Sequence, residues 1–212
     1  MKIGINGTGL VQKASIDAIK ADAIKAAEDG FKSYWLAEHP TGGFDALTVL
    51  AVIASSVPDI EMGTAVVPTF PRHPMALAGQ ALTSQTALQG RLCLGVGLSH
   101  EVMMAQLGIG FKKPIRHLRE YLSILMPLLE KGQVSYVGET LSCEAQVFRP
   151  AEPVPSVVVA ALGPQALRVA GSRTDGTTLA WVGPKTIAEH IVPCINEAAN
   201  KANRKPPRVI AT

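Results

Sequence analysis

The sequence has little of what would mark an unusual protein class. Aromatic residues make up 5% of its 212 residues and charged residues 17%, and the formal net charge is only +3. Because the charge is nearly balanced and no basic run is interleaved with aromatics, we expect no nucleic-acid partner. Apolar runs long enough to cross a bilayer are also lacking, so we expect no membrane partner.

Cysteine is scarce as well. The three cysteines are odd in number, and no pair of them has the spacing of metal ligands. No set of His, Asp and Glu has such spacing either, so we predict no metal site. Free thiols are typical of a reducing compartment, and Met1 and Lys2 lead directly into a strand rather than a signal peptide. We therefore expect a cytoplasmic location.

What the sequence does contain is apolar residues, 47% of the total, which is enough for one sizeable core. Residues 61–100 organise the rest. Two apolar runs, 60–67 and 91–96, flank a helical pattern at 73–88. Runs without alternation indicate strands buried on both faces of a parallel sheet, so this is a βαβ unit. Ligands bind at the carboxyl ends of such strands, and these two ends should share one mouth.

The same period continues along the chain. Strands are predicted to start near residues 3, 31, 60 and 91, about every thirty residues, and further apolar strands at 155–161, 176–182 and 207–211. Seven strands indicate one TIM-like (β/α)8 barrel domain over residues 1–212, cut short before its last βα unit. We expect residues 133–148 to form a small hairpin excursion that follows a long helix. That helix begins at Pro114 and should expose Glu120.

Polar residues at the predicted strand ends are the candidates for chemistry. Glu38 and His39 follow the second strand and His100 follows the fourth, so these three are candidate acid–base residues. A lone histidine is as often structural, and that alternative stays open. Gly95 to Ser99 is either a cofactor loop or a simple tight turn. Gly7-Thr8-Gly9 lacks a third glycine, which favours a plain turn over a dinucleotide site.

Seven motifs in a fixed order carry a family resemblance. They are EMGTAVVP (61–68), FPRHP (70–74), QALT (80–83), GRLCLGVGLSH (90–100), RHLREYL (116–122), AALGP (160–164) and AEHIVP (188–193). No single motif is decisive, but together they cover most of the chain. In this combination the sequence resembles the luciferase-like monooxygenase superfamily, and most of all its coenzyme F420-dependent oxidoreductase branch.

The resemblance implies a barrel of the bacterial luciferase type with a flavin-like ring in its mouth. It implies a non-prolyl cis peptide beneath the ring, which maps to Ala65-Val66, and a polar residue facing the ring at Glu38 and His39. The ribityl and phosphate part would lie against the loop after the fourth strand and the turn after the fifth. The implied cofactor-binding residues are Ala65, Val66, Gly95, Gly97, Ser99, Leu162, Gly163 and Pro164.

Three functions remain open on this resemblance. The first is an oxidoreductase, expected to be a homodimer, that passes a hydride between coenzyme F420 and a small organic substrate. The second is a monooxygenase that uses flavin mononucleotide (FMN). The third is a short, non-catalytic relative that binds a flavin or only a partner, because family barrels continue through an eighth strand. The carboxylates of a deazaflavin tail would suit basic residues, which the sequence alone does not single out.

Overall fold

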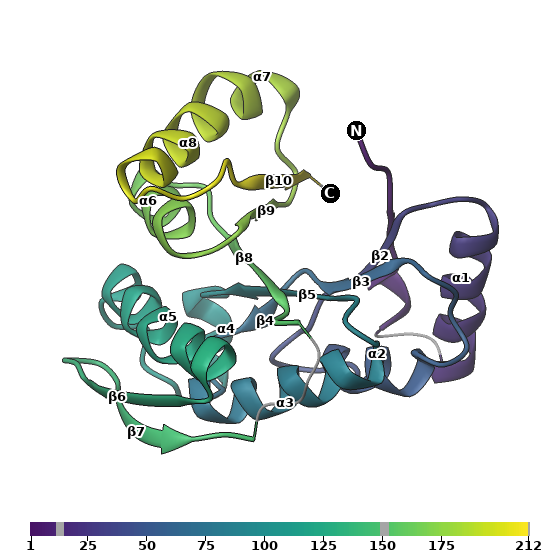
Figure 1. Ribbon diagram of the computed structural model, residues 1–212, viewed down its shortest axis with the longest axis horizontal. Helices are drawn as coiled ribbons and strands as arrows, with labels where there is room; N and C mark the ends of the chain where they lie inside the picture. The colour runs from purple at the N-terminus through teal and green to yellow at the C-terminus, as the bar shows by residue number, and fades with distance from the viewer. Residues whose placement is uncertain (12–14, 149–152, 212) are drawn as a thin grey trace.

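The computed structural model describes residues 1–11, 15–148 and 153–211. In these ranges, parallel strands form one curled sheet in the order β1-β2-β3-β5-β8-β9-β10, and the short β4 pairs with β5 (Figure 1). The predicted α/β class is thus confirmed, as a parallel half-barrel of seven strands. The strands are β1 (Ile5–Asn6), β2 (Ser33–Leu36), β3 (Glu61–Thr64), β4 (Val67–Pro68), β5 (Leu92–Gly97), β8 (Ser156–Ala160), β9 (Gly176–Leu179) and β10 (Arg208–Ala211).

Helices cover the outer face of this sheet, and several begin at the capping residues that the sequence supplies. The Ser15 hydroxyl accepts a hydrogen bond from the backbone N–H of Ala18, and the Asp45 carboxylate accepts one from that of Thr48. The helices are α1 (Ile16–Glu28), α2 (Ala46–Ile53), α3 (Pro74–Ala87), α4 (Glu101–Gln106), α5 (Pro114–Lys131), α6 (Pro164–Arg173), α7 (Pro184–Thr186) and α8 (Val192–Lys201), with a π-helical turn at Ile187–Ile191 between the last two.

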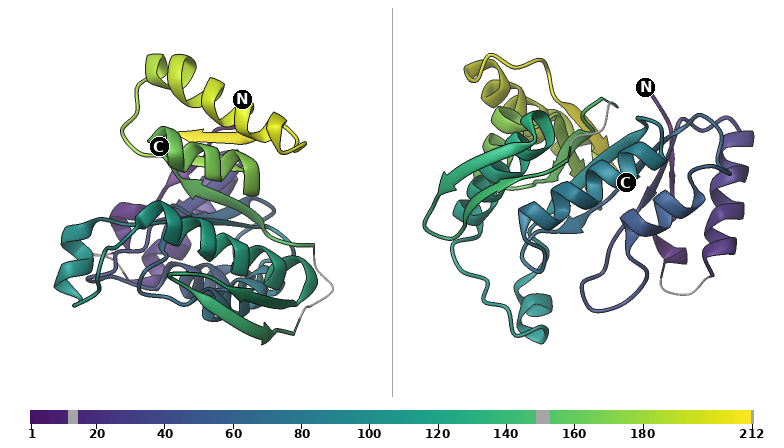
Figure 2. Two further views of the ribbon diagram at one scale, coloured as in Figure 1. Left: turned by 90° about the vertical axis from the view of Figure 1, so that its left-hand side faces the viewer. Right: turned by 60° about the horizontal axis from the view of Figure 1, so that its bottom comes forward.

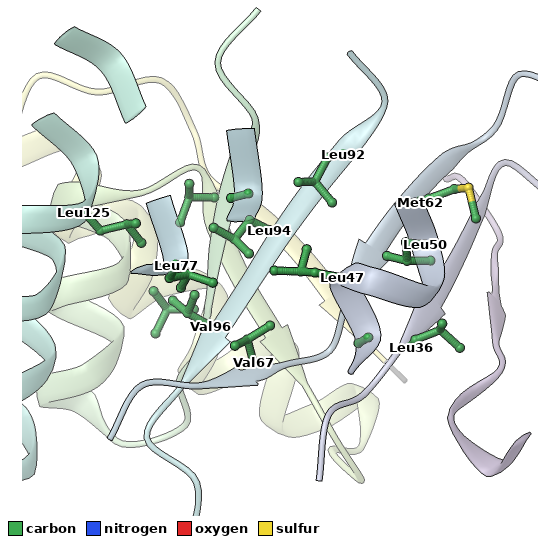
Figure 3. Packing of buried hydrophobic residues seen from close by; sticks show 14 of the residues in the cluster. Leu36, Leu47, Leu50, Met62, Val67, Leu77, Leu92, Leu94, Val96 and Leu125 are labelled. Atoms are coloured by element: carbon green, nitrogen blue, oxygen red, sulfur yellow. The ribbon is translucent and has the colours of Figure 1, made fainter. Parts of the chain in front are cut away.

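Alternation along the strands separates two apolar layers. On β5, Leu92, Leu94 and Val96 belong to the main core that the sheet shares with the helices (Figure 3). Cys93 instead faces the inside of the half-barrel, where it packs with Trp35 and Val158. Because side chains alternate along a strand, the next inward positions of β5 are Gly95 and Gly97. The inside is therefore packed at its floor and lined by small residues toward the carboxyl ends.

A hairpin leaves the sheet as predicted. Strands β6 (Gln133–Val137) and β7 (Ser142–Gln146) pair antiparallel, and they lie beside α5 rather than in the barrel wall (Figures 1 and 2). One prediction nearby is wrong: Glu120 of α5 is only 4% exposed. Its carboxylate accepts backbone hydrogen bonds from the turn of the hairpin, so the packing of the hairpin overrides the helical pattern.

Three further segments differ from what the sequence predicts. The run at 60–67 is not one strand, because a cis peptide bond between Ala65 and Val66 separates β3 from β4. Residues 98–113 contain α4, which was not predicted because six residues are too few for a helical periodicity to be recognised. The first strand is also shorter than predicted, since β1 covers only Ile5–Asn6.

The half-barrel is open between its two edge strands, β1 and β10. A cavity of about 600 Å³ lies there, lined by residues of both edges and by Trp35 on the inner face. At the strand-start end, Arg208 of β10 pairs with Glu61 of β3 through two contacts of 2.7 and 2.9 Å. Arg208 thereby joins two strands that lie far apart in the order of the sheet. Among the described helices, none has the length and apolarity needed to cross a bilayer.

Candidate functional site

The carboxyl ends of the strands form a mouth around the cis peptide. This bond lies at Ala65-Val66, the position that the resemblance implied. The Ala65 N–H donates to the Leu36 carbonyl at 2.8 Å, and the Glu38 N–H donates to the Val66 carbonyl at 3.3 Å. The bulge after β3 is therefore held to the exit of β2 on both sides of the cis bond, which brings Glu38 to its edge.

Two glycines of β5 make room for this bulge. A Cβ at Gly95 would overlap the carbonyl oxygen of Thr64, and one at Gly97 would lie 2.6 Å from a methyl carbon of Val66. The Thr64 hydroxyl also donates to the Gly95 carbonyl at 2.8 Å and accepts from its N–H at 2.9 Å. The structure thus gives these glycines a packing role, while contact with a cofactor stays a prediction for both.

A pair of carboxylates shares one guanidinium at the mouth. Arg72 lies 3.0 Å from a carboxylate oxygen of Glu38 and 2.8 Å from one of Asp45. Burial raises the pKa of Glu38, although Arg72 opposes this. Burial also acts on Asp45, but hydrogen bonds from Thr48 and Gln80 outweigh it and hold the pKa of Asp45 below its usual value. Asp45 is thereby kept anionic, and Glu38 is the member of the pair suited to exchange a proton.

Helix α5 fixes the loop that carries Arg72. The Tyr121 hydroxyl donates to the Arg72 carbonyl at 2.9 Å, and the His117 ring nitrogen lies 3.2 Å from the Thr69 hydroxyl. The ring of Phe70 stacks on His117 with centroids 3.9 Å apart. Burial lowers the pKa of His117 to about 4, so this residue is neutral at physiological pH. The sequence predicted no chemical role for His117, and its contacts are those of a structural residue.

The structure places the other predicted residues around the same mouth without testing their roles. His39 is half-buried beside Glu38, and Ser99 adopts a left-handed backbone with φ of 63°. His100 is exposed at the start of α4 and makes no side-chain capping hydrogen bond there. Leu162, Gly163 and Pro164 lie at the exposed start of α6, where the Leu162 carbonyl contacts a ring nitrogen of His190 at 3.0 Å.

Several residues at the mouth were missed by sequence reasoning. Asp45, at the start of α2, contacts Arg72 at a separation of 27 residues, and Gln80 of α3 contacts Asp45 at a separation of 35 residues. No short-range sequence pattern indicates contacts over such separations. Trp181, just after β9, is 99% exposed and has φ of 56°. The signal available in the sequence was a tryptophan near the end of a predicted strand, where apolar side chains can face a ligand. Within the described ranges, no group of three His, Cys, Asp or Glu residues could hold a metal ion.

Comparisons with known proteins agree with this geometry. A family profile described as luciferase-like monooxygenase matches residues 3–212. An F420-dependent glucose-6-phosphate dehydrogenase of Nakamurella multipartita is 29% identical over 197 residues, which are 86% of this chain and 58% of the relative. The chain therefore spans less than two thirds of the length of this curated relative.

Solved structures share the fold. An F420-dependent secondary alcohol dehydrogenase, in complex with an F420-acetone adduct, superposes with a TM-score of 0.86 and 19% identity, over all of this chain and 68% of the other. The oxygenating constituent of 3,6-diketocamphane monooxygenase of Pseudomonas putida, in complex with FMN, gives a TM-score of 0.83 and 19% identity, over 100% and 66%.

Proposed function

The chain belongs to the luciferase-like monooxygenase family. From that premise we propose that it functions as a coenzyme F420-dependent oxidoreductase. A small organic compound would be the substrate. The single observation that carries this proposal is the Glu38–Arg72–Asp45 cluster, which lies beside the cis bulge. It supplies one proton-exchanging carboxyl at the edge of a mouth built for a flat ring. Relatives described as F420-dependent support the choice of coenzyme.

The residues at the mouth fit a deazaflavin. The inward side chains near the carboxyl ends are small, at Ala65, Gly95, Gly97 and Ala160, and they lie above the packed floor of Trp35, Cys93 and Val158. Small side chains over a solid floor leave the space that a tricyclic ring requires. Helix α6 begins at Gly163 without a side-chain cap, so its free N–H groups suit a phosphate.

Each group then has a distinct task. A bound deazaflavin supplies hydride transfer at carbon 5 of its ring. Ala65, Val66, Gly95, Gly97 and Ser99 would hold the ring from β3 and β5, and Leu162, Gly163 and Pro164 would hold the phosphate end. Glu38 would give or take the substrate proton, while His39 and His100 would polarise or orient the substrate. Arg72 and Asp45 would keep Glu38 in place.

The proposal also covers the domain organisation, the oligomeric state and the location of the protein. Residues 1–212 would act as one luciferase-like barrel domain, with 133–148 as an excursion. The protein would be a homodimer, because the half-barrel has open edges that need covering. It would work in the cytoplasm, which the free thiols of Cys93, Cys143 and Cys194 support.

An FMN-dependent monooxygenase is the second candidate, favoured by the structural likeness to the FMN-bound oxygenating subunit. Titration of the purified protein with F420 and, separately, with FMN decides between them, with binding followed by fluorescence and mass measured by light scattering. We expect tight binding of F420 and the mass of a dimer. Preference for FMN, together with oxygen consumption, would replace the reductase by the monooxygenase. Binding of neither would support a non-catalytic relative.

A further inference from the structure

Three arginines surround an open cleft on the outer surface of the half-barrel, away from the Arg72 cluster. The cleft has a volume of about 480 Å³ and lies between α5 and α6, which are neighbours in Figure 1. Its lining consists of Arg119 from α5, and Gln165, Arg168, Val169, Ser172 and Arg173 from α6. No acidic residue belongs to this lining, so the cleft gathers positive charge alone.

The arginines lack the partners that arginines usually have. Among the residues that the structure describes, none of the three lies within 4.0 Å of a carboxylate oxygen. The charge of Arg168 contributes to lowering the pKa of Glu197 on α8, but the Glu197 carboxylate accepts its hydrogen bond from Lys201. Like charges placed together without a counterion destabilise a fold, which makes an anionic ligand the simplest reason for their presence.

Arg173 shows that the cluster is built into the fold. Its guanidinium donates to the Ser123 hydroxyl of α5 at 2.9 Å and so bridges the two helices. Burial lowers the pKa of Arg173, and the nearby charge of Arg119 lowers it further, although Tyr136 acts in the opposite direction. A guanidinium held in place by one neutral hydrogen bond retains other donors for a ligand.

One end of the cleft lies near the start of α6. Helix α6 follows directly on the Leu162-Gly163 turn, and Gln165 and Arg168 lie in its first two turns. A chain that leaves a phosphate at the start of α6 could follow the first two turns of the helix into the cleft. We propose that the Arg119–Arg168–Arg173 cleft binds the anionic tail of the deazaflavin coenzyme. This assignment rests on the proposed function, and bidentate arginine–carboxylate contacts would carry it.

The test compares coenzymes that share a ring and differ in the tail. The probes are the tail-free chromophore, F420 with no glutamate, and F420 with several glutamates, each titrated by fluorescence against the wild-type protein at low and high salt. We expect affinity to rise with glutamate number and this gain to disappear at high salt. A rise with the phosphate alone, and none with glutamate, would overturn the assignment of the cleft to the carboxylates of the tail.

Variants locate the effect. Arg119→Gln and Arg168→Gln should each weaken the binding of long-tailed F420 by about three- to tenfold and leave the tail-free chromophore unchanged. Lys20→Gln on α1 is the matched control, since it removes one charge outside the cleft. Equal affinity of the wild-type protein for tail-free and long-tailed probes would overturn this inference and leave the proposed function standing. If no probe binds, the proposed function itself fails.

Discussion

Glu38 is the residue whose charge state the mouth controls most directly. Its environment contains opposing influences, because burial raises its pKa and Arg72 lowers it. A carboxyl whose pKa is raised in the folded state favours folding below its unfolded pKa, and this contribution is lost as pH rises through the folded value. Asp45 has the opposite sign, so the two carboxyls respond to pH in different windows.

Replacing Arg72 should move Glu38 in a defined direction. In Arg72→Gln the opposing positive charge is gone, so the pKa of Glu38 should rise further above its usual value. A ¹³C NMR titration of the glutamate side chains measures this without any cofactor. Arg204→Gln, which breaks a pair with the distant Asp175, is the matched control and should leave Glu38 unchanged. An unchanged or lower pKa of Glu38 in Arg72→Gln would show that the ion pair does not operate in solution.

His117 makes stability depend on pH in the weakly acidic range. Its pKa is about 4 in the folded protein and about 6.5 when exposed. A histidine with a lowered pKa contributes stability above its unfolded pKa, and this is lost as pH falls toward the folded value. Between pH 7 and pH 5 the loss should be about 2 kcal/mol.

His117→Phe keeps an aromatic ring against Phe70 but removes the titrating imidazole. The free energy of unfolding of this variant should therefore fall less than that of the wild type between pH 7 and pH 5. Urea unfolding of both proteins at pH 7 and pH 5 measures the difference. His100→Phe serves as the control, because His100 is exposed and should retain the wild-type pH dependence. Identical pH dependence in His117→Phe and wild type would mean that His117 is not buried as a neutral ring.

Sequence reasoning reached single residues only where a local pattern or a family motif marked them. The cis peptide at Ala65-Val66 was placed through the resemblance, and Glu38 through its position after a strand. The partners of Glu38 could not be found in this way. Arg72 and Asp45 meet it only because β2, α2 and the loop after β4 converge, and no short-range pattern encodes a contact across 27 or 34 residues.

At the scale of elements, one buried carboxylate attaches the hairpin to the barrel. Glu120 accepts hydrogen bonds from the backbone N–H groups of Glu139, Thr140 and Leu141 at 3.1, 2.7 and 3.0 Å. Although burial opposes ionisation, these donors and the Thr140 hydroxyl hold the pKa of Glu120 below its usual value. The turn of the hairpin thus has its backbone donors satisfied by a side chain of α5.

Glu120→Gln should loosen this attachment. The amide keeps one acceptor oxygen but loses the charge, so we expect a loss of about 2 kcal/mol of stability and faster hydrogen exchange at residues 139–141. Glu130→Gln, on an exposed turn of the same helix, is the matched control and should change neither quantity. Unaltered exchange in Glu120→Gln would show that the apolar face of the hairpin and the ion pairs of Glu139 with Lys113 and Arg116 are sufficient to hold it.

Strands and helices were predicted best where apolar periodicity extends over many residues. Helices α3 and α5 and strands β5, β8 and β9 lie where the sequence placed them, because burial on the sheet decides both their pattern and their structure. Short or locally distorted elements were missed. Helix α4 has six residues, too few to show a period, and the division of β3 from β4 depends on one peptide bond that apolar composition does not reveal.

At the scale of the whole molecule, seven parallel strands curl without closing. Residues of the edge strands β1 and β10 both line the cavity of about 600 Å³. The strand count and the curl followed from the βα period, whereas the link across the opening did not. Glu61 and Arg208 are 147 residues apart and pair only because the sheet curls.

This ion pair should help to hold the curl. Both of its hydrogen bonds join one guanidinium to one carboxylate, a geometry that resists exchange with water better than a single contact. Both side chains are partly exposed, which limits the coupling to about 1 kcal/mol. Urea unfolding of Glu61→Gln, Arg208→Gln and the double variant gives the coupling energy.

The matched comparison is the same cycle on Lys25 and Asp29, a pair at the C-terminal end of α1 that joins neighbouring turns of one segment. We expect the Glu61–Arg208 cycle to give the larger coupling, because its partners come from β3 and β10 on opposite walls. We also expect Arg208→Gln to speed hydrogen exchange in β10 while β5 stays protected, since β10 pairs with β9 alone in the described sheet. Equal coupling energies in both cycles would mean that the Glu61–Arg208 pair stabilises the fold no more than an ordinary exposed pair. The strands themselves would then hold the opening.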